Sequence, residues 1–381
     1  MAGKLIVVKI GTGSLVRSDG SLNLESMKRL VDQIAQVVKK GHKVILVTSG
    51  AIAAGIAELN VKPNPNDIVF KQACAAAGQS ILMSHYREFF KAYGLKVAQV
   101  LLTEKDLADR MSYLHTCNVF ERLLQLGVIP IVNENDVTSI NEIIPVMKGQ
   151  EVNFSDNDIL SVLIANATEA DLVVILTTVD GLYTKSPEKP DADLIPVVEK
   201  ITSELRKAAE GKSKFGRGGM KTKIQAAEIA MRSGIPLVIA NSQRENVLLD
   251  VLDGKQVGTF FKPMGEGLSS IKRWIAYSAG TKGQIRVNEG AKKAILKGAS
   301  LLAVGIESVS GRFLIGEVVS LVGPDGKEFA RGIANYTSEE INLIKGMNTA
   351  QIRKTLGYIR QKEVINRKRM YLKEEEKSDE Q

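Results

Sequence analysis

Short apolar runs alternate with longer stretches of helical periodicity over the first two thirds of the chain. The apolar runs are unbroken Val, Ile and Leu segments, as is typical of strands buried on both faces of a parallel sheet. Their alternation with helices predicts an α/β fold, an open and mostly parallel sheet sandwiched by helices. The expected strands are Leu5–Ile10, Val44–Val47, Lys96–Leu102, Val128–Val132, Leu172–Leu176 and Pro236–Ala240. The expected helices are Leu24–Lys40, Ala51–Leu59, Lys71–Tyr93, Ser112–Leu126, Ile159–Asn166 and Thr222–Ser233.

The pattern changes near residue 260. Residues 1–262 are expected to form the first domain, and the Pro- and Gly-containing stretch 263–276 a linker. Short β-like runs separated by turn signals then predict a small β-barrel over residues 277–352. The charged stretch 353–381 is expected to be a helix followed by a tail. The strands expected in the barrel are Gln284–Val287, Ser300–Val304, Val318–Val322 and Glu328–Ile333, with one short helix at Glu289–Lys297.

Length and composition narrow the class of protein. A chain of 381 residues fits two or three domains of about 150 residues each. A hydrophobic fraction of 44% and a charged fraction of 25% exclude a wholly disordered chain. No apolar run approaches the roughly 20 residues of a membrane helix. Two cysteines and three scattered histidines form neither a disulfide framework nor a metal-ligand spacing. These counts argue against a secreted disulfide protein and a metallohydrolase, and they favour a cytoplasmic location.

The net charge of +8 is unevenly distributed. Residues 353–373 contain eight basic side chains and one acidic one, whereas residues 374–381 contain one Lys and five acidic side chains. Two interpretations stay open at this point. The basic stretch contacts a nucleic acid, or it is the solvated face of a helix beside a frayed tail.

Two glycine-rich turns offer backbone N–H groups to an anion. Gly11–Ser14 follows the first strand and has Lys9 beside it, but it lacks the further residues of a Walker loop or a dinucleotide fingerprint. A plain tight turn is the alternative. Gly216–Lys223 carries three glycines and three basic residues where a helix begins. Free N–H groups and the helix dipole favour a phosphate at such a place, although a flexible basic loop would also explain the glycines.

Polar residues also gather at other strand and helix ends. Asn133–Asp136 ends the strand Val128–Val132, and Asp156–Asp158 opens the helix Ile159–Asn166. One residue of the second cluster suffices to cap the helix, so the excess indicates ligand contacts. Ser49-Gly50 follows a third strand and is either a helix cap or a substrate anchor.

This combination suits phosphoryl transfer to the carboxylate of an amino acid. The side-chain carboxylate of free glutamate has a pKa of about 4.3 and is ionised at pH 7, so the reaction needs no general base. The obstacle is repulsion between this anion and a polyanionic phosphate donor. Lysines, backbone N–H groups and Mg²⁺ lower that barrier by neutralising charge.

Short motifs of the chain also match those of a known family. The stretches VVKIGTGSL, VTSGAIAAG, KQACAAAGQ, PIVNENDV, SDNDILSVLIA, DGLYTKSP, GRGGMKTKIQAA and KRW occur in that order over residues 4–274. Together they resemble the glutamate 5-kinases, in the long form that carries a C-terminal PUA domain. The resemblance implies an amino-acid-kinase fold and ATP-dependent phosphorylation of L-glutamate to L-glutamyl 5-phosphate, the first step of proline biosynthesis. It also implies Mg²⁺ as the companion of ATP, and the motifs assign no protein ligand to this ion.

The same resemblance assigns roles by position. Lys9 and Lys223 match the pair that stabilises the transferring phosphoryl group, and Asp158 matches the residue that orients them. Thr178 stands where many members have Asp, and Arg217 where Thr is frequent. The residues that match the family's glutamate site are Ser49, Asp136 and Asn157. The residues that match its ATP site are Lys9, Thr177, Thr178, Arg217, Gly218, Gly219, Met220, Lys221, Thr222 and Lys223.

The family further implies association into a homo-oligomer and feedback inhibition by L-proline. Two alternative functions are weighed against glutamate phosphorylation. One is another amino-acid kinase, such as acetylglutamate kinase, against which the PUA-like extension and the NENDV and SDND motifs argue. The other is RNA binding through the PUA-like domain, which leaves the whole N-terminal site unexplained.

Overall fold

The structure is a computed structural model that describes residues 3–64, 66–139, 156–185, 187–208, 219–264 and 267–373. The chain divides into two compact units. One comprises residues 1–107 and 111–268, and the other residues 108–110 and 269–381. The division at residue 268 falls inside the stretch 263–276 that was expected to be a linker.

The first unit is built on an eight-stranded sheet in the order β3-β4-β2-β1-β5-β7-β8-β6. All neighbouring strands run parallel except β7 and β8, which are antiparallel. The mostly parallel sheet expected from the unbroken apolar runs is therefore confirmed. The strands are β1 Leu5–Ile10, β2 Lys43–Val47, β3 Lys96–Leu102, β4 Val128–Glu134, β5 Leu172–Thr177, β6 Val197–Val198, β7 Leu237–Asn241 and β8 Thr259–Phe261.

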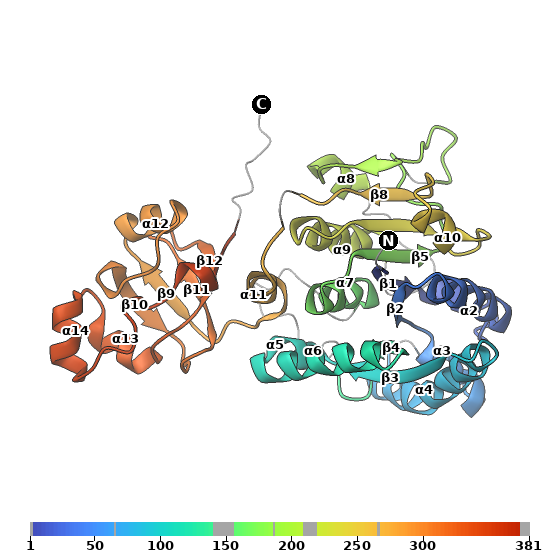
Figure 1. Cartoon of the computed structure of the whole chain (residues 1–381), viewed down its shortest axis with the longest axis horizontal. Coiled ribbons are helices and arrows are strands. Elements are labelled where there is room, and N and C mark those ends of the chain that lie inside the picture. Colours follow the sequence, from blue (N-terminus) through green and yellow to red (C-terminus); the bar gives the residue numbers. More distant parts are fainter. Residues whose placement is uncertain are drawn as a thin grey trace. The chain divides into compact units, whose positions relative to one another are not determined.

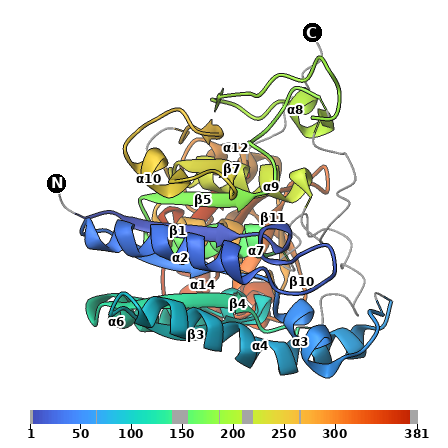
Figure 2. The same cartoon turned by 90° about the vertical axis from the view of Figure 1, so that its right-hand side faces the viewer.

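Helices cover both faces of this sheet (Figure 1). Figure 2 is seen from the right-hand side of Figure 1 and has α2, α4 and α10 toward the viewer. These three helices share one hydrophobic core with Ile6, Val8 and Ile10 of β1, whereas α7 packs beside α9. The helices of the unit are α1 Thr12–Leu15, α2 Leu24–Lys39, α3 Ala51–Leu59, α4 Ile68–Lys91, α5 Glu104–Ala108, α6 Arg110–Gln125, α7 Asn157–Thr168, α8 Ser203–Ala208, α9 Met220–Arg232 and α10 Val247–Leu252.

Side-chain alternation along β1 sends Lys9 to the other face of the sheet. Successive residues of a strand point to opposite faces. Because Ile6, Val8 and Ile10 point into the core shared with α2, Lys9 lies on the opposite face, where α7 packs against β1. The position of Lys9 thus follows from the sequence once the strand is known.

The helices α3 and α4 approach each other through two glycines. A Cβ atom at Gly55 would lie 1.8 Å from the carbonyl oxygen of Cys74, and one at Gly78 would lie 2.0 Å from that of Ala51. Only hydrogen fits in such spaces. The contact fixes the start of α3, which directly follows the Ser49-Gly50 turn at the end of β2.

The second unit contains a five-stranded sheet in the order β10-β9-β11-β12-β13, in which only β9 and β11 are parallel. The Pro-Asp-Gly turn joins β11 to β12, and Gly326 in it has a φ of +76°. The strands are β9 Gln284–Val287, β10 Ile306–Ser310, β11 Val318–Val322, β12 Glu328–Ile333 and β13 Met370–Leu372. The helices are α11 Ser270–Arg273, a π-helix at Trp274–Ser278, α12 Glu289–Leu296, α13 Ser338–Ile344, α14 Thr349–Leu356, and 3₁₀ turns at Ala303–Gly305 and Arg367–Arg369.

Two expectations for this unit are wrong. Residues 300–304 do not form a strand, since Leu301 makes only an isolated bridge to Ile365 and the strand begins at Ile306. The helix expected at the start of the stretch 353–381 ends at Leu356, where Gly357 adopts a φ of +79°. The chain then returns to the sheet as β13, because its apolar residues, among them Ile365, are buried in the core of the unit. Residues 374–381 lie outside the described residues.

Among the helices of the described ranges, none combines the length and the apolar composition required to cross a lipid bilayer.

Candidate active site

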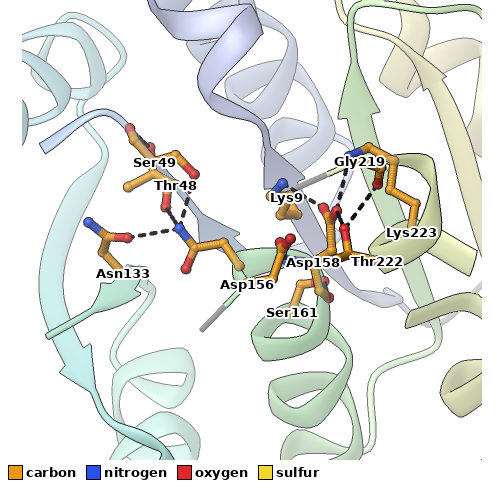
Figure 3. A network of polar contacts seen from close by, with 11 residues as sticks. Lys9, Thr48, Ser49, Asn133, Asp156, Asp158, Ser161, Gly219, Thr222 and Lys223 are labelled. Atoms are coloured by element: carbon orange, nitrogen blue, oxygen red, sulfur yellow. Dashed lines mark hydrogen bonds and ion pairs between the residues drawn. The ribbon is translucent and has the colours of Figure 1, made fainter. Parts of the chain in front are cut away.

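Polar side chains from several parallel strands meet at the C-terminal edge of the first sheet (Figure 3). Ligands of open α/β sheets bind beyond this edge, because the turns and helix N-termini that follow the strands are gathered there. Lys9 comes from β1, Ser49 follows β2, and Asn133 comes from β4. Asn157 and Asp158 come from the first turn of α7.

A carboxylate between two ammonium groups forms the first part of the site. Asp158 Oδ1 lies 2.5 Å from Lys9 Nζ, and Asp158 Oδ2 lies 2.9 Å from Lys223 Nζ. The hydroxyl of Thr222 lies 3.1 Å from the same Oδ2. The three elements that bring these side chains together, β1, α7 and α9, are far apart in the sequence. The predicted catalytic residues Lys9, Asp158 and Lys223 are therefore adjacent in space.

Burial makes this cluster electrostatically strong. Lys9 and Lys223 are 4% and 5% exposed, and Asp158 is fully buried. Burial by itself raises the pKa of Asp158, but the charges of Lys9 and Lys223 outweigh it and lower that pKa to about 2. The carboxylate is thus ionised at pH 7 and holds both ammonium groups at one place.

The depressed pKa predicts a pH dependence of stability. The folded value of about 2 lies below the ordinary value of 3.8, so ionisation of Asp158 is expected to favour the folded state by about 2 kcal/mol above pH 5, relative to the protonated form. About half of that stabilisation is expected to be lost by pH 3. Urea unfolding of the wild-type protein and of Asp158→Asn at pH 7 and pH 3 measures it. The difference in unfolding free energy between wild type and Asp158→Asn should be about 1 kcal/mol smaller at pH 3 than at pH 7. An equal difference at both pH values would contradict a lowered pKa of Asp158.

The start of α9 and the Gly11–Ser14 turn form the second part of the site. Gly219 is the N-cap of α9, and within the described ranges no side chain caps the first-turn N–H groups of Met220, Lys221 and Thr222, which point to where an anion would bind. A Cβ atom at Gly13 would lie 3.1 Å from the side chain of Thr178, which follows Thr177 at the end of β5. Thr178 therefore contacts the Gly11–Ser14 turn, and a Cβ atom at Gly11 of the same turn would lie 3.6 Å from Lys9 Nζ. Arg217 and Gly218 lie outside the described residues.

An amide network forms the third part of the site. The side-chain amide nitrogen of Asn157 lies 2.9 Å from the carbonyl oxygen of Thr48 and 3.0 Å from both Ser49 Oγ and Asn133 Oδ1. Two of the three predicted substrate residues, Ser49 and Asn157, are thus in direct contact. The third, Asp136, is half-buried in the turn that follows β4.

Sequence reasoning missed two members of this network. Thr48 contributes a backbone carbonyl, for which no side-chain pattern exists. Asn133 belongs to the NEND cluster that was noticed, but its 2% exposure and its contact with Asn157 single it out only in the structure.

Asp156 caps α7, as expected, with only one of its two carboxylate oxygens. Its Oδ1 accepts a hydrogen bond from the backbone N–H of Asp158 at 2.8 Å, whereas its buried Oδ2 has no hydrogen-bond partner within the part of the chain that the structure describes. That part holds no group of three or more His, Cys, Asp and Glu suited to a metal ion. A nucleotide-bound Mg²⁺ needs only one or two protein carboxylates beside phosphate oxygens and water, and Asp156 Oδ2 fits that requirement.

Comparison with known proteins decides the family. The family model "Amino acid kinase family" matches residues 4–241, which is more than half of the chain. The chain belongs to the amino acid kinase family. A second model, "PUA domain", matches residues 283–356 in the second unit. The two-domain family resemblance inferred from the motifs is confirmed.

Individual relatives extend the similarity over nearly the whole chain of this amino acid kinase. It is 46% identical over 372 residues to "Glutamate 5-kinase" of Thermoanaerobacter sp. (strain X514), covering 97% of this chain and 98% of the relative. It is 47% identical over 365 residues to "Glutamate 5-kinase" of Caldanaerobacter subterraneus subsp. tengcongensis, covering 95% and 96%. A solved structure of carbamate kinase from Giardia lamblia bound to AMP-PNP shares 21% identity at a TM-score of 0.48, over 69% of this chain and 99% of that one.

Proposed function

We propose that this chain phosphorylates the γ-carboxylate of L-glutamate with ATP, giving L-glutamyl 5-phosphate and ADP in the first step of proline biosynthesis. The observation that carries the proposal is the buried Lys9–Asp158–Lys223 cluster between an anion-binding helix start and an amide network. The similarity to relatives named glutamate 5-kinase over nearly the full length supports the choice of substrate.

The reaction needs charge neutralisation rather than proton transfer. A γ-carboxylate oxygen of glutamate forms a bond to the γ-phosphorus of ATP as the bond from that phosphorus to the β,γ-bridging oxygen breaks. The bridging oxygen keeps the electron pair and leaves as part of ADP. Lys9 and Lys223 stabilise the negative charge on the transferring group, and Asp158 fixes both ammonium groups in advance.

The neighbouring groups would bind and orient the two substrates. The N–H groups at the start of α9 and the Gly11–Ser14 turn suit the phosphates of ATP. Ser49, Asn157 and Asp136 suit the polar groups of glutamate, with Asp136 offering a carboxylate to its ammonium group. Asp156 Oδ2 would be the protein ligand of a nucleotide-bound Mg²⁺, which when bound supplies further neutralisation of phosphate charge.

A coupled assay tests the proposal. Purified protein with ATP, Mg²⁺ and L-glutamate is expected to release ADP only when glutamate is present, and hydroxylamine should trap the acyl phosphate as a hydroxamate. N-acetyl-L-glutamate in place of L-glutamate is the matched control, because it differs only at the amino group. Turnover with the acetylated compound and none with glutamate would transfer the assignment to acetylglutamate kinase.

Four expectations from the sequence stay predictions. They are inhibition by L-proline, association of chains into an oligomer, a cytoplasmic location and RNA binding by the second unit. The basic residues that prompted the RNA interpretation are not on one helix. Arg353 lies on α14, whereas Arg367–Arg369 form the 3₁₀ turn before β13.

A further inference from the structure

A glutamine on α4 stands at the outer end of the amide network. Gln79 Oε1 accepts a hydrogen bond from Asn133 Nδ2 at 3.0 Å, and Asn133 Oδ1 in turn accepts one from Asn157 Nδ2 at 3.0 Å. The three amides belong to α4, β4 and α7, and they form a relay that ends at a predicted glutamate-binding residue. Gln79 ends the KQACAAAGQ motif quoted above, but its residue type and spacing alone predict no role for it.

Backbone groups fix the direction of two of the three amides in this relay, those of Asn133 and Asn157. The backbone N–H of Glu134 donates to Asn133 Oδ1 at 3.0 Å, so that atom is an acceptor and the Asn133 nitrogen faces Gln79. Residue 79 must therefore present an oxygen. At the other end the carbonyl of Thr48 accepts only, so the nitrogen of Asn157 faces it. Asn157 Oδ1 is consequently turned away, and it is buried without a hydrogen-bond partner in the described ranges.

The packing of α4 holds Gln79 in place. Its neighbour Gly78 touches the backbone of α3 at Ala51, so α4 cannot shift without moving the Ser49-Gly50 turn. Gln72 lies seven residues earlier, on the same face of the helix, and donates to the carbonyl of Ser139 at 3.0 Å. One face of α4 thus contacts the end of β4 through Asn133 and the segment that follows β4 through Ser139.

We propose that Gln79 is a positioning residue for the glutamate site, and this rests on the function proposed above. Its oxygen accepts from the Asn133 amide and helps to hold it in the orientation that the backbone N–H of Glu134 requires. Asn133 Oδ1 in turn helps to hold Asn157 against the carbonyl of Thr48. Asn157 then offers Oδ1, an acceptor with no other partner in the described ranges, to a donor such as the ammonium group of glutamate. A wrong orientation would place a donor where the substrate also has a donor, so affinity for glutamate would fall.

Gln79→Met tests the relay, because Met is similar in size and has no strong acceptor. We expect the KM for L-glutamate to rise about tenfold, the effect of one lost hydrogen bond, with the KM for ATP within about twofold of wild type. Gln79→Glu keeps an acceptor oxygen and should leave the glutamate KM within about twofold of wild type. An equal rise in both variants, or none in Gln79→Met, would overturn the proposal.

A double-mutant cycle separates a relay from a general loosening of the fold. In an Asn133→Ala background, Gln79→Met should change the glutamate KM by less than about twofold, because its effect passes through Asn133. A full tenfold effect in that background would overturn the relay.

Gln33→Met is the matched control: Gln33 is a buried glutamine whose oxygen accepts from the backbone of Leu248, outside the network. It should lower the melting temperature and leave the glutamate KM unchanged.

The wild-type measurement distinguishes failure of the proposed function from failure of the role proposed for Gln79. If the wild-type protein shows no glutamate-dependent turnover, the proposed function fails. If it does, and Gln79→Met behaves like wild type, only the role of Gln79 fails.

Discussion

Lys223→Ala is expected to lower kcat by about 10²- to 10³-fold while the KM for L-glutamate changes by less than about threefold. Lys223 is 5% exposed and its ammonium nitrogen lies 2.9 Å from Asp158 Oδ2, so removing the side chain takes away a charge that solvent screens only weakly. Its charge matters most as negative charge develops on the transferring phosphoryl group. Lys9→Ala should have an effect of the same kind, because Lys9 is paired with the other oxygen of Asp158. Steady-state kinetics with glutamate and ATP varied in turn measure both constants.

The control for this experiment is a lysine that is paired but exposed. Lys262 lies 3.0 Å from Glu199 on the surface and is more than half exposed, so Lys262→Ala should leave kcat within about twofold of wild type. A rise in the glutamate KM of Lys223→Ala with an unchanged kcat would place Lys223 in substrate binding rather than in catalysis.

The catalytic cluster was largely predictable because each member has a local sequence signal. Lys9 interrupts a buried strand, and its face follows from the alternation of Ile6, Val8 and Ile10. Asp158 lies in the first turn of a helix that Asp156 already caps, so its carboxylate is not needed as a cap and can serve another purpose. That both belong to one site with Lys223 came from the family resemblance, because the strand order that joins them depends on contacts between distant segments.

The amide network was less predictable for a physical reason. Asn157 contacts Thr48 and Ser49 over more than 100 residues of sequence, and one of its partners is a backbone carbonyl. Neither periodicity nor residue type reports such a contact. Gln79 ends the KQACAAAGQ motif in an Ala-rich helix, but its place in the motif does not say what it contacts, and its hydrogen bond from Asn133 is visible only in the structure.

In the second unit, local charge was a poor guide to structure. The basic composition of residues 353–373 favoured a solvated helix, yet Val364, Ile365 and Met370 within it are fully buried. Burial of these three side chains outweighs the helical preference of their neighbours, and the segment closes the sheet as β13. The few apolar residues of this segment were therefore a better guide to its structure than its many charged residues.

Gly78→Ala is expected to destabilise the first unit by about 1–3 kcal/mol or more, and the sign of this change distinguishes two effects. Helix propensity alone favours Ala over Gly by about 1 kcal/mol in a helix interior. In this structure, however, the new Cβ atom would lie 2.0 Å from the carbonyl oxygen of Ala51 and 2.2 Å from the nitrogen of Gly55. Both are backbone atoms of α3, which cannot move aside as a flexible side chain would. The overlap should therefore outweigh the gain in propensity.

The displacement should also reach the active site. Pushing α3 away from α4 moves the Ser49-Gly50 turn and shifts Gln79, so we expect the glutamate KM to rise together with the loss of stability. Chemical unfolding followed by circular dichroism gives the first quantity and steady-state kinetics the second. Gly280→Ala is the control, because a Cβ atom there meets nothing within 4 Å. A variant Gly78→Ala that is as stable as wild type or more so would show that α3 and α4 are not in backbone contact at this point.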